Sequence, residues 1–246
     1  MVDENIIRKI IHSIRIQPED TLVEIGPGLG ALTRPLLQTA GLLQVIEIDR
    51  DAIAHLETEI APLGNLIIHQ GNVLKFDLNL INPKPLRIIG NLPYHISTPI
   101  LFHCLTFANS IQDMTFMLQN EVVDRMCAEP NTPDYGRLSV MIQYHCLASK
   151  LFTVSRHAFS PSPKVESAMV RLVPYNEKPF PVQDERLFAD IVRYAFNQRR
   201  KTLRNSLRAL LDVAIMDQID MDWSKRAEQL SPAEYAILCE NVRCLL

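Results

Sequence analysis

Five short apolar runs divide the first half of the chain and constrain its fold more than any other feature. They occupy residues 21–26, 42–49, 65–71, 85–91 and 114–120. Several are apolar throughout rather than at alternate positions, which is typical of strands buried on both faces of a sheet. Helical patterns lie between most of them, at residues 31–39, 50–60 and 97–107. This alternation predicts a doubly wound α/β domain, in which ligands bind beyond the carboxyl ends of the strands.

The flanking segments complete the predicted fold. An opening amphipathic helix places isoleucines at helical spacing, at Ile6, Ile7, Ile10, Ile11 and Ile14. Residues 149–155 and 167–173, joined by the proline-rich "FSPSPKVE", indicate a hairpin that closes the sheet. After a linker-like stretch at 174–182, every pattern is helical: 184–197, 201–211 and a last helix opened by the capping box Ser231-Pro232-Ala233-Glu234. We therefore predict two domains, residues 1–178 around the sheet and a small all-helical domain at residues 179–246.

Composition limits the class of protein. The 246 residues are 47% hydrophobic, enough for one sizeable core and a small second domain. No run of about 18 apolar residues and no secretory leader pattern is present, so we expect a cytoplasmic protein. The five cysteines are odd in number and form no CxxC pair, which favours packing over a disulfide framework or a zinc site.

The net charge of −3 conceals an uneven distribution of charged residues. Residues 150–208 carry 12 Lys and Arg against 5 Asp and Glu, whereas the segments before and after them are acidic. One basic belt on an otherwise acidic chain indicates a polyanionic partner. A solvated helix face is the alternative that composition leaves open.

A glycine-rich loop follows the first predicted strand. "VEIGPGLGALT" places Gly26, Gly28 and Gly30 before a helix, where glycines let the backbone approach a ligand closely. Glu47 ends the next strand and can accept hydrogen bonds from ribose hydroxyls. Together they predict an adenosine-containing cofactor rather than a plain turn. Because Gly26-x-Gly28-x-x-Ala31 also satisfies the dinucleotide fingerprint, a nicotinamide-dependent oxidoreductase stays open.

The tetrapeptide Asn91-Leu92-Pro93-Tyr94 ends the fourth predicted strand, over the same crevice as the glycine loop. Tyr94 can stack on a planar base, while the Asn91 side-chain oxygen and the Leu92 carbonyl can accept hydrogen bonds from its exocyclic amine. Pro93 restricts Leu92 to extended conformations and so directs that carbonyl. A plain turn after a strand is the alternative.

Seven stretches together resemble the ribosomal RNA adenine N6,N6-dimethyltransferases, specifically the bacterial small-subunit type. They are "EIGPGLGALT", "VIEIDRD", "GNLPYHISTPI", "FMLQNEVVDRM", "YGRLSV", "FSPSPKVESAMVRL" and "NQRRKTLRNSL". The resemblance implies a Rossmann-like class I S-adenosylmethionine-dependent methyltransferase, without a metal, that dimethylates two adjacent adenosines in the 3′-terminal hairpin loop of 16S rRNA. We expect a monomer that acts on the small ribosomal subunit.

The resemblance also implies roles for individual residues. The methionine end of S-adenosylmethionine would lie near Gly26, Gly28 and Asn91, its ribose on Glu47 beside Ile48, and its adenine edge near Asn72 and Val73. The target adenine would lie at Asn91, Leu92 and Tyr94, with Phe159 over its opposite face. For Phe159 the alternative is a hairpin-tip aromatic packed on the body of the protein.

The basic belt would contact RNA phosphates through Arg199, Arg200, Lys201 and Arg204, with Arg156 and Lys164 on the hairpin extending the path. Arg204 and Arg208 could instead form pairs within their own helix. The target base must lie in a loop or be flipped, because a base inside a duplex cannot reach such a pocket.

Two departures from the family pattern are visible. Asn72 stands where the family usually has Asp, which predicts an uncharged contact to the donor's adenine. The family's basic N-terminal segment with a Gln-x-Phe-Leu element is not seen, since the chain starts at what resembles the helix after it. Three alternatives stay open: a macrolide-resistance enzyme acting on 23S rRNA, a nicotinamide-dependent oxidoreductase, and a non-catalytic factor that only checks the small subunit.

Overall fold

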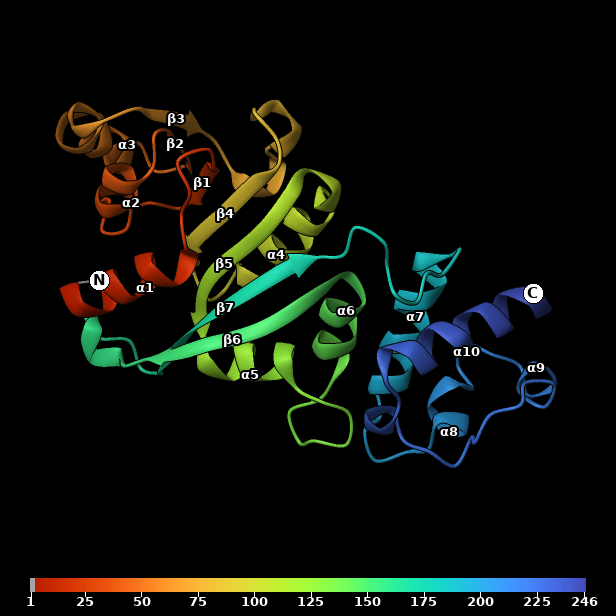
Figure 1. The fold of residues 1–246 in the computed structure, drawn as a ribbon. Coiled ribbons are helices and arrows are strands. Elements are labelled where there is room, and N and C mark those ends of the chain that lie inside the picture. The colour runs from red at the N-terminus through yellow and green to blue at the C-terminus, as the bar shows by residue number, and fades with distance from the viewer. Residues whose placement is uncertain (1–2) are drawn as a thin grey trace. The chain divides into compact units, whose positions relative to one another are not determined.

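A seven-stranded sheet organises the computed structural model, which describes residues 3–246 (Figure 1). The strands are β1 (Thr21–Ile25), β2 (Leu43–Glu47), β3 (Leu66–Gln70), β4 (Leu86–Asn91), β5 (Ile111–Gln119), β6 (Cys146–Val154) and β7 (Ser167–Pro174). Their order in the sheet is β3-β2-β1-β4-β5-β7-β6. The first five strands pair in parallel and β7 runs antiparallel to β5. The predicted α/β sheet with a closing hairpin is confirmed.

Burial of the strands follows their place in the sheet. Every residue of β1 and β2 is buried, as the continuous apolar runs predicted. The edge strand β3 is only partly covered, and Ile67 is 43% exposed. The central strands are therefore the buried part of the sheet, and the loops at their carboxyl ends lie where ligands bind in such sheets.

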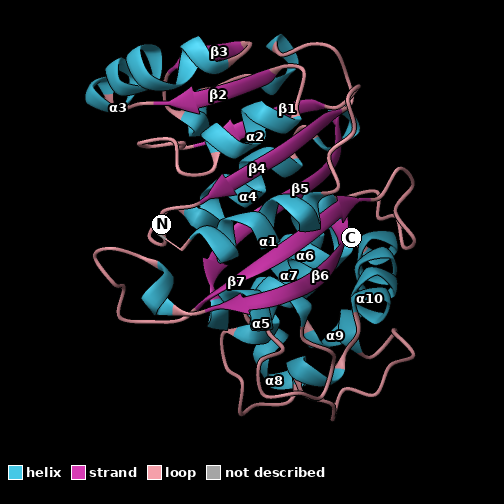
Figure 2. Cartoon of the chain, turned by 60° about the vertical axis from the view of Figure 1, so that its left-hand side comes forward, coloured by secondary structure: helices cyan, strands magenta, loops and turns pink. Residues whose placement is uncertain are grey.

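Helices flank this sheet and also make up the rest of the chain (Figure 2). They are α1 (Glu4–Ile14), α2 (Thr33–Thr39), α3 (Arg50–His55), α4 (Ser97–Leu105), α5 (Asn120–Cys127), α6 (Arg137–His145), α7 (Glu185–Phe196), α8 (Leu203–Leu207), α9 (Val213–Met216) and α10 (Pro232–Leu245). The predicted capping box of α10 is present, with the Ser231 hydroxyl accepting from the Glu234 amide and the Glu234 carboxylate accepting from the Ser231 amide. Helices α5 and α6 were not predicted, since no turn residue separates β5 from α5.

The chain forms two compact units. The sheet unit runs up to Val123 and includes Ser149–Pro174, and the helical unit comprises Asp124–Ala148 and Tyr175–Leu246. Residues 124–148, which the sequence assigned to the first domain, thus pack with the C-terminal helices. The helical unit has its own core, in which the side chains of Tyr135, Phe188 and Tyr235 are fully buried.

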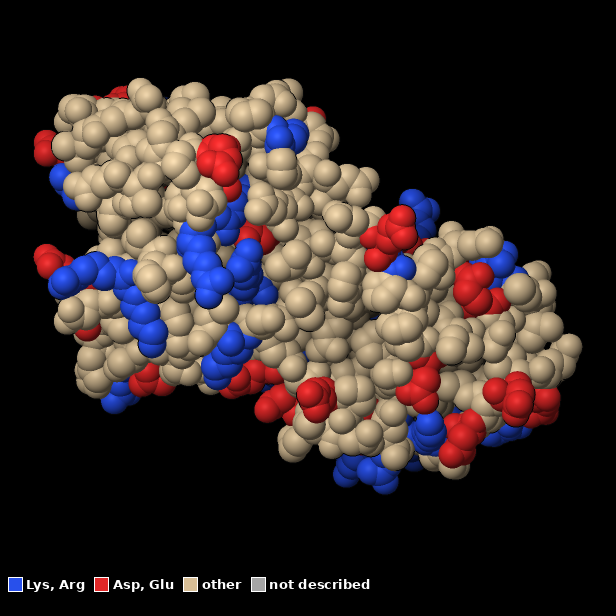
Figure 3. Space-filling view, viewed as in Figure 1, with Lys and Arg blue, Asp and Glu red and all other residues tan. Residues whose placement is uncertain are grey.

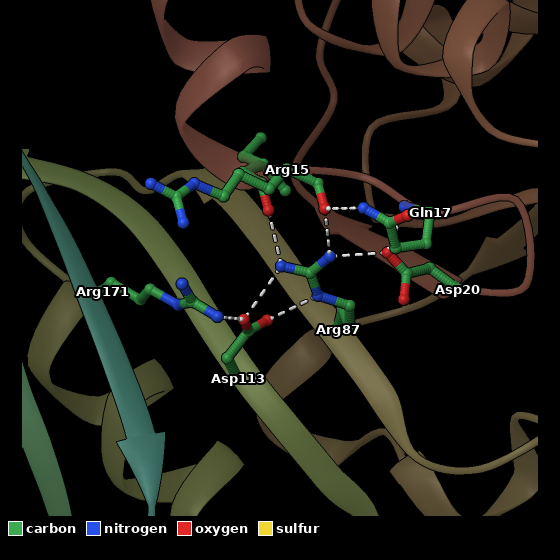
Figure 4. Close-up of polar contacts among 7 residues, drawn as sticks. Arg15, Gln17, Asp20, Arg87, Asp113 and Arg171 are labelled. Carbon is green, nitrogen blue, oxygen red and sulfur yellow. Dashed lines mark hydrogen bonds and ion pairs between the residues drawn. The ribbon is translucent and has the colours of Figure 1, made fainter.

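A buried ion cluster ties the end of α1 to the sheet (Figure 4). The Arg87 guanidinium, on β4, donates to both carboxylate oxygens of Asp113, at 2.9 Å each, and to Asp20. It also donates to the carbonyls of Ile14, at 2.6 Å, and Arg15, at 3.2 Å. Arg171 on β7 donates to the same Asp113 carboxylate. One arginine thereby joins α1, the link into β1, β4 and β5 in a fully hydrogen-bonded arrangement.

The cysteines of the described residues are free thiols. Cys104, Cys146 and Cys239 are buried, and burial raises the pKa of each thiol to about 12. Such thiols are neutral and poorly reactive, as expected of packing residues. Within residues 3–246, no cluster of His, Cys, Asp and Glu side chains has the arrangement of a metal site. None of the helices in that range is long and apolar enough to span a membrane.

Candidate active site

The glycine loop leaves β1 in a left-handed conformation. Gly26, Gly28 and Gly30 have φ of 65°, 54° and 79°, values that side-chain-bearing residues adopt at a cost. A Cβ on Gly30 would meet Ile60 at 3.1 Å, so this glycine serves helix packing. At Gly26 and Gly28 a Cβ would meet nothing within 4 Å. These two glycines therefore combine a backbone conformation that favours glycine with free space beside it, as a loop that receives a ligand requires.

Glu47 holds the glycine loop against β2. Its carboxylate accepts hydrogen bonds from the amides of Ile48 at 2.7 Å, Asp49 at 2.9 Å and Gly28 at 3.1 Å. The side chain is 7% exposed. A carboxylate has about four acceptor sites, so it retains capacity for a further donor. Glu47 thus shapes the loop as well as facing the cavity beside it.

Two cavities meet at Gly26 and Gly28. One, of about 430 Å³, has the predicted residues Glu47, Ile48, Asn72 and Val73 in its lining. The other, of about 480 Å³, runs from the glycine loop to Asn91. Volumes of a few hundred Å³ are typical of cofactor and small-ligand sites. The cavities provide one compartment on each side of the loop.

Asn72 occupies the rim of the first cavity. Its side-chain oxygen accepts from the amide of Leu74 at 3.0 Å and so caps a short 3₁₀ turn at Val73–Lys75. The oxygen keeps a second lone pair, and the side chain is exposed. Val73 is buried and Ile48 is 62% exposed, and both line the same cavity, so apolar side chains share its wall with the amide.

Glu24 is a feature that the sequence analysis did not single out. It is the fourth of the five residues of β1, is 2% exposed, and lines the second cavity. Its Oε2 atom has no hydrogen-bond partner among residues 3–246. Burial raises the pKa of Glu24 to about 7, the charge of Glu47 adds to the rise, and the nearby Thr33 hydroxyl opposes it. A buried carboxylate facing a cavity with a free oxygen is suited to a cationic group of a ligand.

The Asn-Leu-Pro-Tyr segment stands at the carboxyl end of β4, as predicted. Asn91 is exposed and lines the second cavity. The Leu92 amide donates to the Met117 carbonyl at 3.2 Å, which holds this segment to the end of β5. A Cβ on Gly90 would lie 2.9 Å from the Ile25 carbonyl oxygen. Gly90 therefore lets the end of β4 approach the start of the glycine loop.

Phe159 lies in the loop between β6 and β7. It is partly buried and packs against the core cluster of the sheet unit. The next residue, Ser160, lines the same cavity as Asn91. The loop thus reaches the site, with the aromatic ring resting on the body of the protein beside it.

The predicted RNA-binding residues divide between the two units. Arg156 and Lys164 are exposed on the β6–β7 loop of the sheet unit, whereas the belt belongs to the helical unit. Figure 3 shows Lys and Arg side chains at the lower margin of the helical unit, below the place of α8 in Figure 1. The Arg199 guanidinium donates to the carbonyls of Pro133 and Tyr135, and Arg204 pairs with Asp217 at 2.7 Å. Arg200 and Lys201 are exposed and form no ion pair within the described residues.

The structure brings most of the predicted site together. The glycine loop, Glu47, Ile48, Asn72, Val73 and Asn91 line the two adjoining cavities. Leu92 is buried behind them, and Tyr94 and Phe159 lie in flanking loops. Glu24, which lines the second cavity, and Gly90, which lets β4 approach the glycine loop, were not predicted. The sequence did contain a signal for Glu24, because a charged residue inside an otherwise apolar strand indicates a specific role for its side chain.

A parallel sheet with this strand order, a hairpin at one end and a glycine loop beside an acidic strand end define a class I S-adenosylmethionine-dependent methyltransferase. A family model described as ribosomal RNA adenine dimethylase matches residues 1–242. The chain belongs to this family.

Relatives and solved structures agree with the family. The chain is 51% identical to a ribosomal RNA small subunit methyltransferase A of Pseudomonas syringae pv. tomato, over 98% of this chain and 90% of that protein. It is 50% identical to the protein of the same name from Alcanivorax borkumensis, over 98% and 86%. The crystal structure of a dimethyladenosine transferase from Plasmodium falciparum matches with a TM-score of 0.81 and 26% identity, covering 96% of this chain and 94% of that one. The 23S rRNA methyltransferase ErmE matches with a TM-score of 0.73 and 25% identity, covering 98% of each chain.

These relationships decide an alternative that the sequence patterns left open. The chain belongs to a family of methyltransferases that use S-adenosylmethionine, and it is not a nicotinamide-dependent oxidoreductase. The residues present fit that donor, since Glu24 and Glu47 bring carboxylates to the two cavities that share Gly26 and Gly28, and S-adenosylmethionine carries both hydroxyl groups and a cationic amino group.

Proposed function

We propose that the protein transfers methyl groups from S-adenosylmethionine to N6 of two adjacent adenosines in the 3′-terminal hairpin loop of 16S rRNA. The observation that carries this proposal is sequence identity. The chain is 50–51% identical to relatives named as small subunit methyltransferases, over 98% of this chain and 86–90% of theirs. The identity to the 23S rRNA enzyme is half as large, at 25%. A substrate in the small ribosomal subunit also implies a cytoplasmic location and a role in ribosome biogenesis.

The two cavities suggest how the donor is held. The compartment lined by Glu47, Ile48, Asn72 and Val73 suits its adenosine half. Gly26 and Gly28 would pass beneath the methionine half, whose cationic amino group finds the free oxygen of Glu24. When bound, S-adenosylmethionine supplies an electrophilic methyl group on a positively charged sulfur, which becomes a neutral thioether when its bond to the methyl carbon breaks.

The Asn-Leu-Pro-Tyr segment prepares the acceptor nitrogen. The N6 lone pair of adenine is delocalised into the ring, so the nitrogen is a poor nucleophile. The Asn91 side-chain oxygen and the Leu92 carbonyl accept hydrogen bonds from the two N6 hydrogens and draw the nitrogen toward tetrahedral geometry. Tyr94 stacks on the base, and Phe159 covers its other face. Positioning then supplies most of the rate.

Proton balance requires no general base. As the new bond from N6 to the methyl carbon forms, the nitrogen becomes an ammonium that is acidic enough to lose its proton to water. The second transfer starts from a nitrogen with one remaining hydrogen. One of the two acceptors, Asn91 or Leu92, must then release its hydrogen bond.

The experiment that tests the function is tritiated methyl transfer to small subunits that lack the modification, with naked 16S rRNA, 23S rRNA and DNA in parallel, followed by nucleoside analysis. We expect N6,N6-dimethyladenosine with small subunits alone. Label in 23S rRNA would support the proposed methyl transfer to adenosine but would show that the proposed substrate is wrong. The absence of transfer to any of them would favour a factor that only checks the subunit.

The same assay tests Asn91. We expect Asn91→Ala to reduce the rate of transfer at least about 100-fold, the usual effect of removing one transition-state contact. Its affinity for S-adenosylmethionine, measured by calorimetry, should change little. Asn176→Ala, at an exposed asparagine of the helical unit, is the control and should behave as wild type. An unchanged rate in Asn91→Ala would remove this residue from the mechanism.

A further inference from the structure

Tyr94 lies in a turn whose backbone makes two hydrogen bonds, and its side chain makes a third contact, to strand β7. The amide of Ile96 donates to the Pro93 carbonyl at 3.1 Å, and the Ser97 hydroxyl donates to the Tyr94 carbonyl at 3.1 Å. These two contacts fix the backbone. The third contact is at the tip of the side chain, where the Tyr94 hydroxyl is 2.8 Å from the hydroxyl of Ser167.

Ser167 is the first residue of the antiparallel strand β7. Because β7 runs opposite to β5, its first residue pairs with Gln119, the last residue of β5. An antiparallel strand thus presents its beginning at the edge where the parallel strands end. The Ser167 side chain is fully buried, and Tyr94 is its hydrogen-bond partner.

Ser167 also stands directly behind the loop that carries Phe159. The Glu166 carbonyl accepts from the Asn120 amide at 3.0 Å, and the Glu166 carboxylate accepts from the Arg156 amide at 3.0 Å. Glu166 therefore fastens both ends of the loop. The start of β7 therefore contacts the Tyr94 hydroxyl through Ser167 and holds the Phe159 loop through the neighbouring Glu166.

From these contacts we propose that Ser167 is a positioning residue of the methyl transfer, which fixes the ring of Tyr94 relative to the loop of Phe159. The inference rests on the proposed function, in which the two aromatic rings enclose the target adenine. A base between two rings needs both rings in place before it arrives, since each torsion that must be ordered on binding costs affinity. The hydroxyl contact removes the rotation of the Tyr94 ring about its first side-chain torsion.

The size of the effect follows from the contact that is lost. A net hydrogen bond between neutral groups contributes about 0.5–1.5 kcal/mol. If this free energy is used to position the ring, its loss lowers kcat/KM by about 2- to 12-fold. The affinity for S-adenosylmethionine should be unaffected, because Ser167 does not line the cavities at the glycine loop.

The test is a double-mutant cycle on Ser167 and Tyr94. Ser167→Ala removes one hydroxyl, and Tyr94→Phe removes the other while keeping the ring. We expect each variant to lose a similar part of kcat/KM, and the double variant to lose no more than either single one. Ser139→Ala is the matched control, since Ser139 is also fully buried and hydrogen-bonded, and its loss should affect stability without affecting kcat/KM.

A second readout reports stacking without catalysis. A short RNA hairpin with 2-aminopurine in place of the target adenine loses fluorescence when the base is stacked between rings. We expect weaker quenching by Ser167→Ala and Tyr94→Phe than by wild type at saturating protein. Wild-type rates and quenching in both variants, or additive losses in the double variant, would overturn the role of Ser167. Absence of methyl transfer by the wild type would instead overturn the proposed function, and the quenching comparison would still decide on Ser167.

Discussion

At the scale of single residues, the charge state of Glu24 should make the stability of the protein depend on pH. Burial raises its pKa to about 7 from an ordinary value of 4.5. Between these values the folded protein keeps a proton that the unfolded chain has lost, so stability falls as the pH rises. The total loss is on the order of 3 kcal/mol once the pH exceeds 7. Glu24→Gln should remove it and be more stable than wild type at pH 8, with little difference at pH 4.5.

Urea unfolding of both proteins at several pH values measures this difference, and parallel stability curves would contradict it.

The same substitution, Glu24→Gln, should weaken the binding of S-adenosylmethionine, since a neutral amide replaces the partner of a cation. Binding to the wild type at pH 6.5 should also release a proton, because a bound cation lowers the pKa of Glu24. Calorimetry in two buffers of different ionisation enthalpy detects such a proton. The residue is therefore expected to trade stability for donor binding.

At the scale of secondary-structure elements, Arg87 joins α1 to the strands. Its side chain is 4% exposed and contacts Asp113 and Asp20, whose side chains are 2% and 8% exposed. Removing one partner of such a cluster leaves buried charges without compensation, at a cost of about 3–5 kcal/mol. We expect Arg87→Met to lower the free energy of unfolding of the sheet unit by this amount. Arg193→Met, at an exposed pair with Asp190, is the control and should change it little.

Circular dichroism in urea follows this transition. The single tryptophan, Trp223, is partly buried and packs against the core of the helical unit, so its fluorescence reports that unit instead. A loss of dichroism at lower urea, with the fluorescence midpoint unchanged, would locate the defect in the sheet unit. Equal midpoints for Arg87→Met and wild type would show that the ion cluster contributes nothing to stability.

The same scale explains what the sequence could and could not predict. The glycine loop, Glu47 and Asn91 were found because each stands in a short pattern next to a predicted strand. The contact between Tyr94 and Ser167 joins residues 73 positions apart, and the ion pair of Arg87 with Asp113 joins residues 26 apart. Such pairs depend on strand order and register, which no local pattern contains. Glu24 falls between these two cases. The sequence shows an acidic residue inside an apolar strand, but only the structure shows that one of its oxygens has no partner among residues 3–246 and that the side chain lines a cavity.

At the scale of the whole molecule, charge counted along the sequence differs from charge on the surface. A group of Lys and Arg side chains lies over the sheet unit where α1 and β7 run, so basic residues are not confined to the helical unit (Figure 3). Within the basic belt of the helical unit, the arginines are also unequal. Arg199 donates to two backbone carbonyls and Arg204 to Asp217, whereas Arg200 and Lys201 point to solvent.

This inequality predicts which belt residues carry the salt dependence of RNA binding. Neutralising RNA phosphates releases counterions, so the affinity for rRNA should fall as salt rises, with a slope that decreases by about one for each contact removed. Arg200→Gln with Lys201→Gln should therefore lower the slope by about two. Arg204→Gln should change it less, because Asp217 already balances that charge. Filter binding of a 16S rRNA fragment from low to moderate salt measures the slopes. A flat response in the wild type would refute phosphate binding by the belt. A slope lowered by about one in Arg204→Gln, as for one full contact, would show that pairing with Asp217 does not withhold Arg204 from RNA.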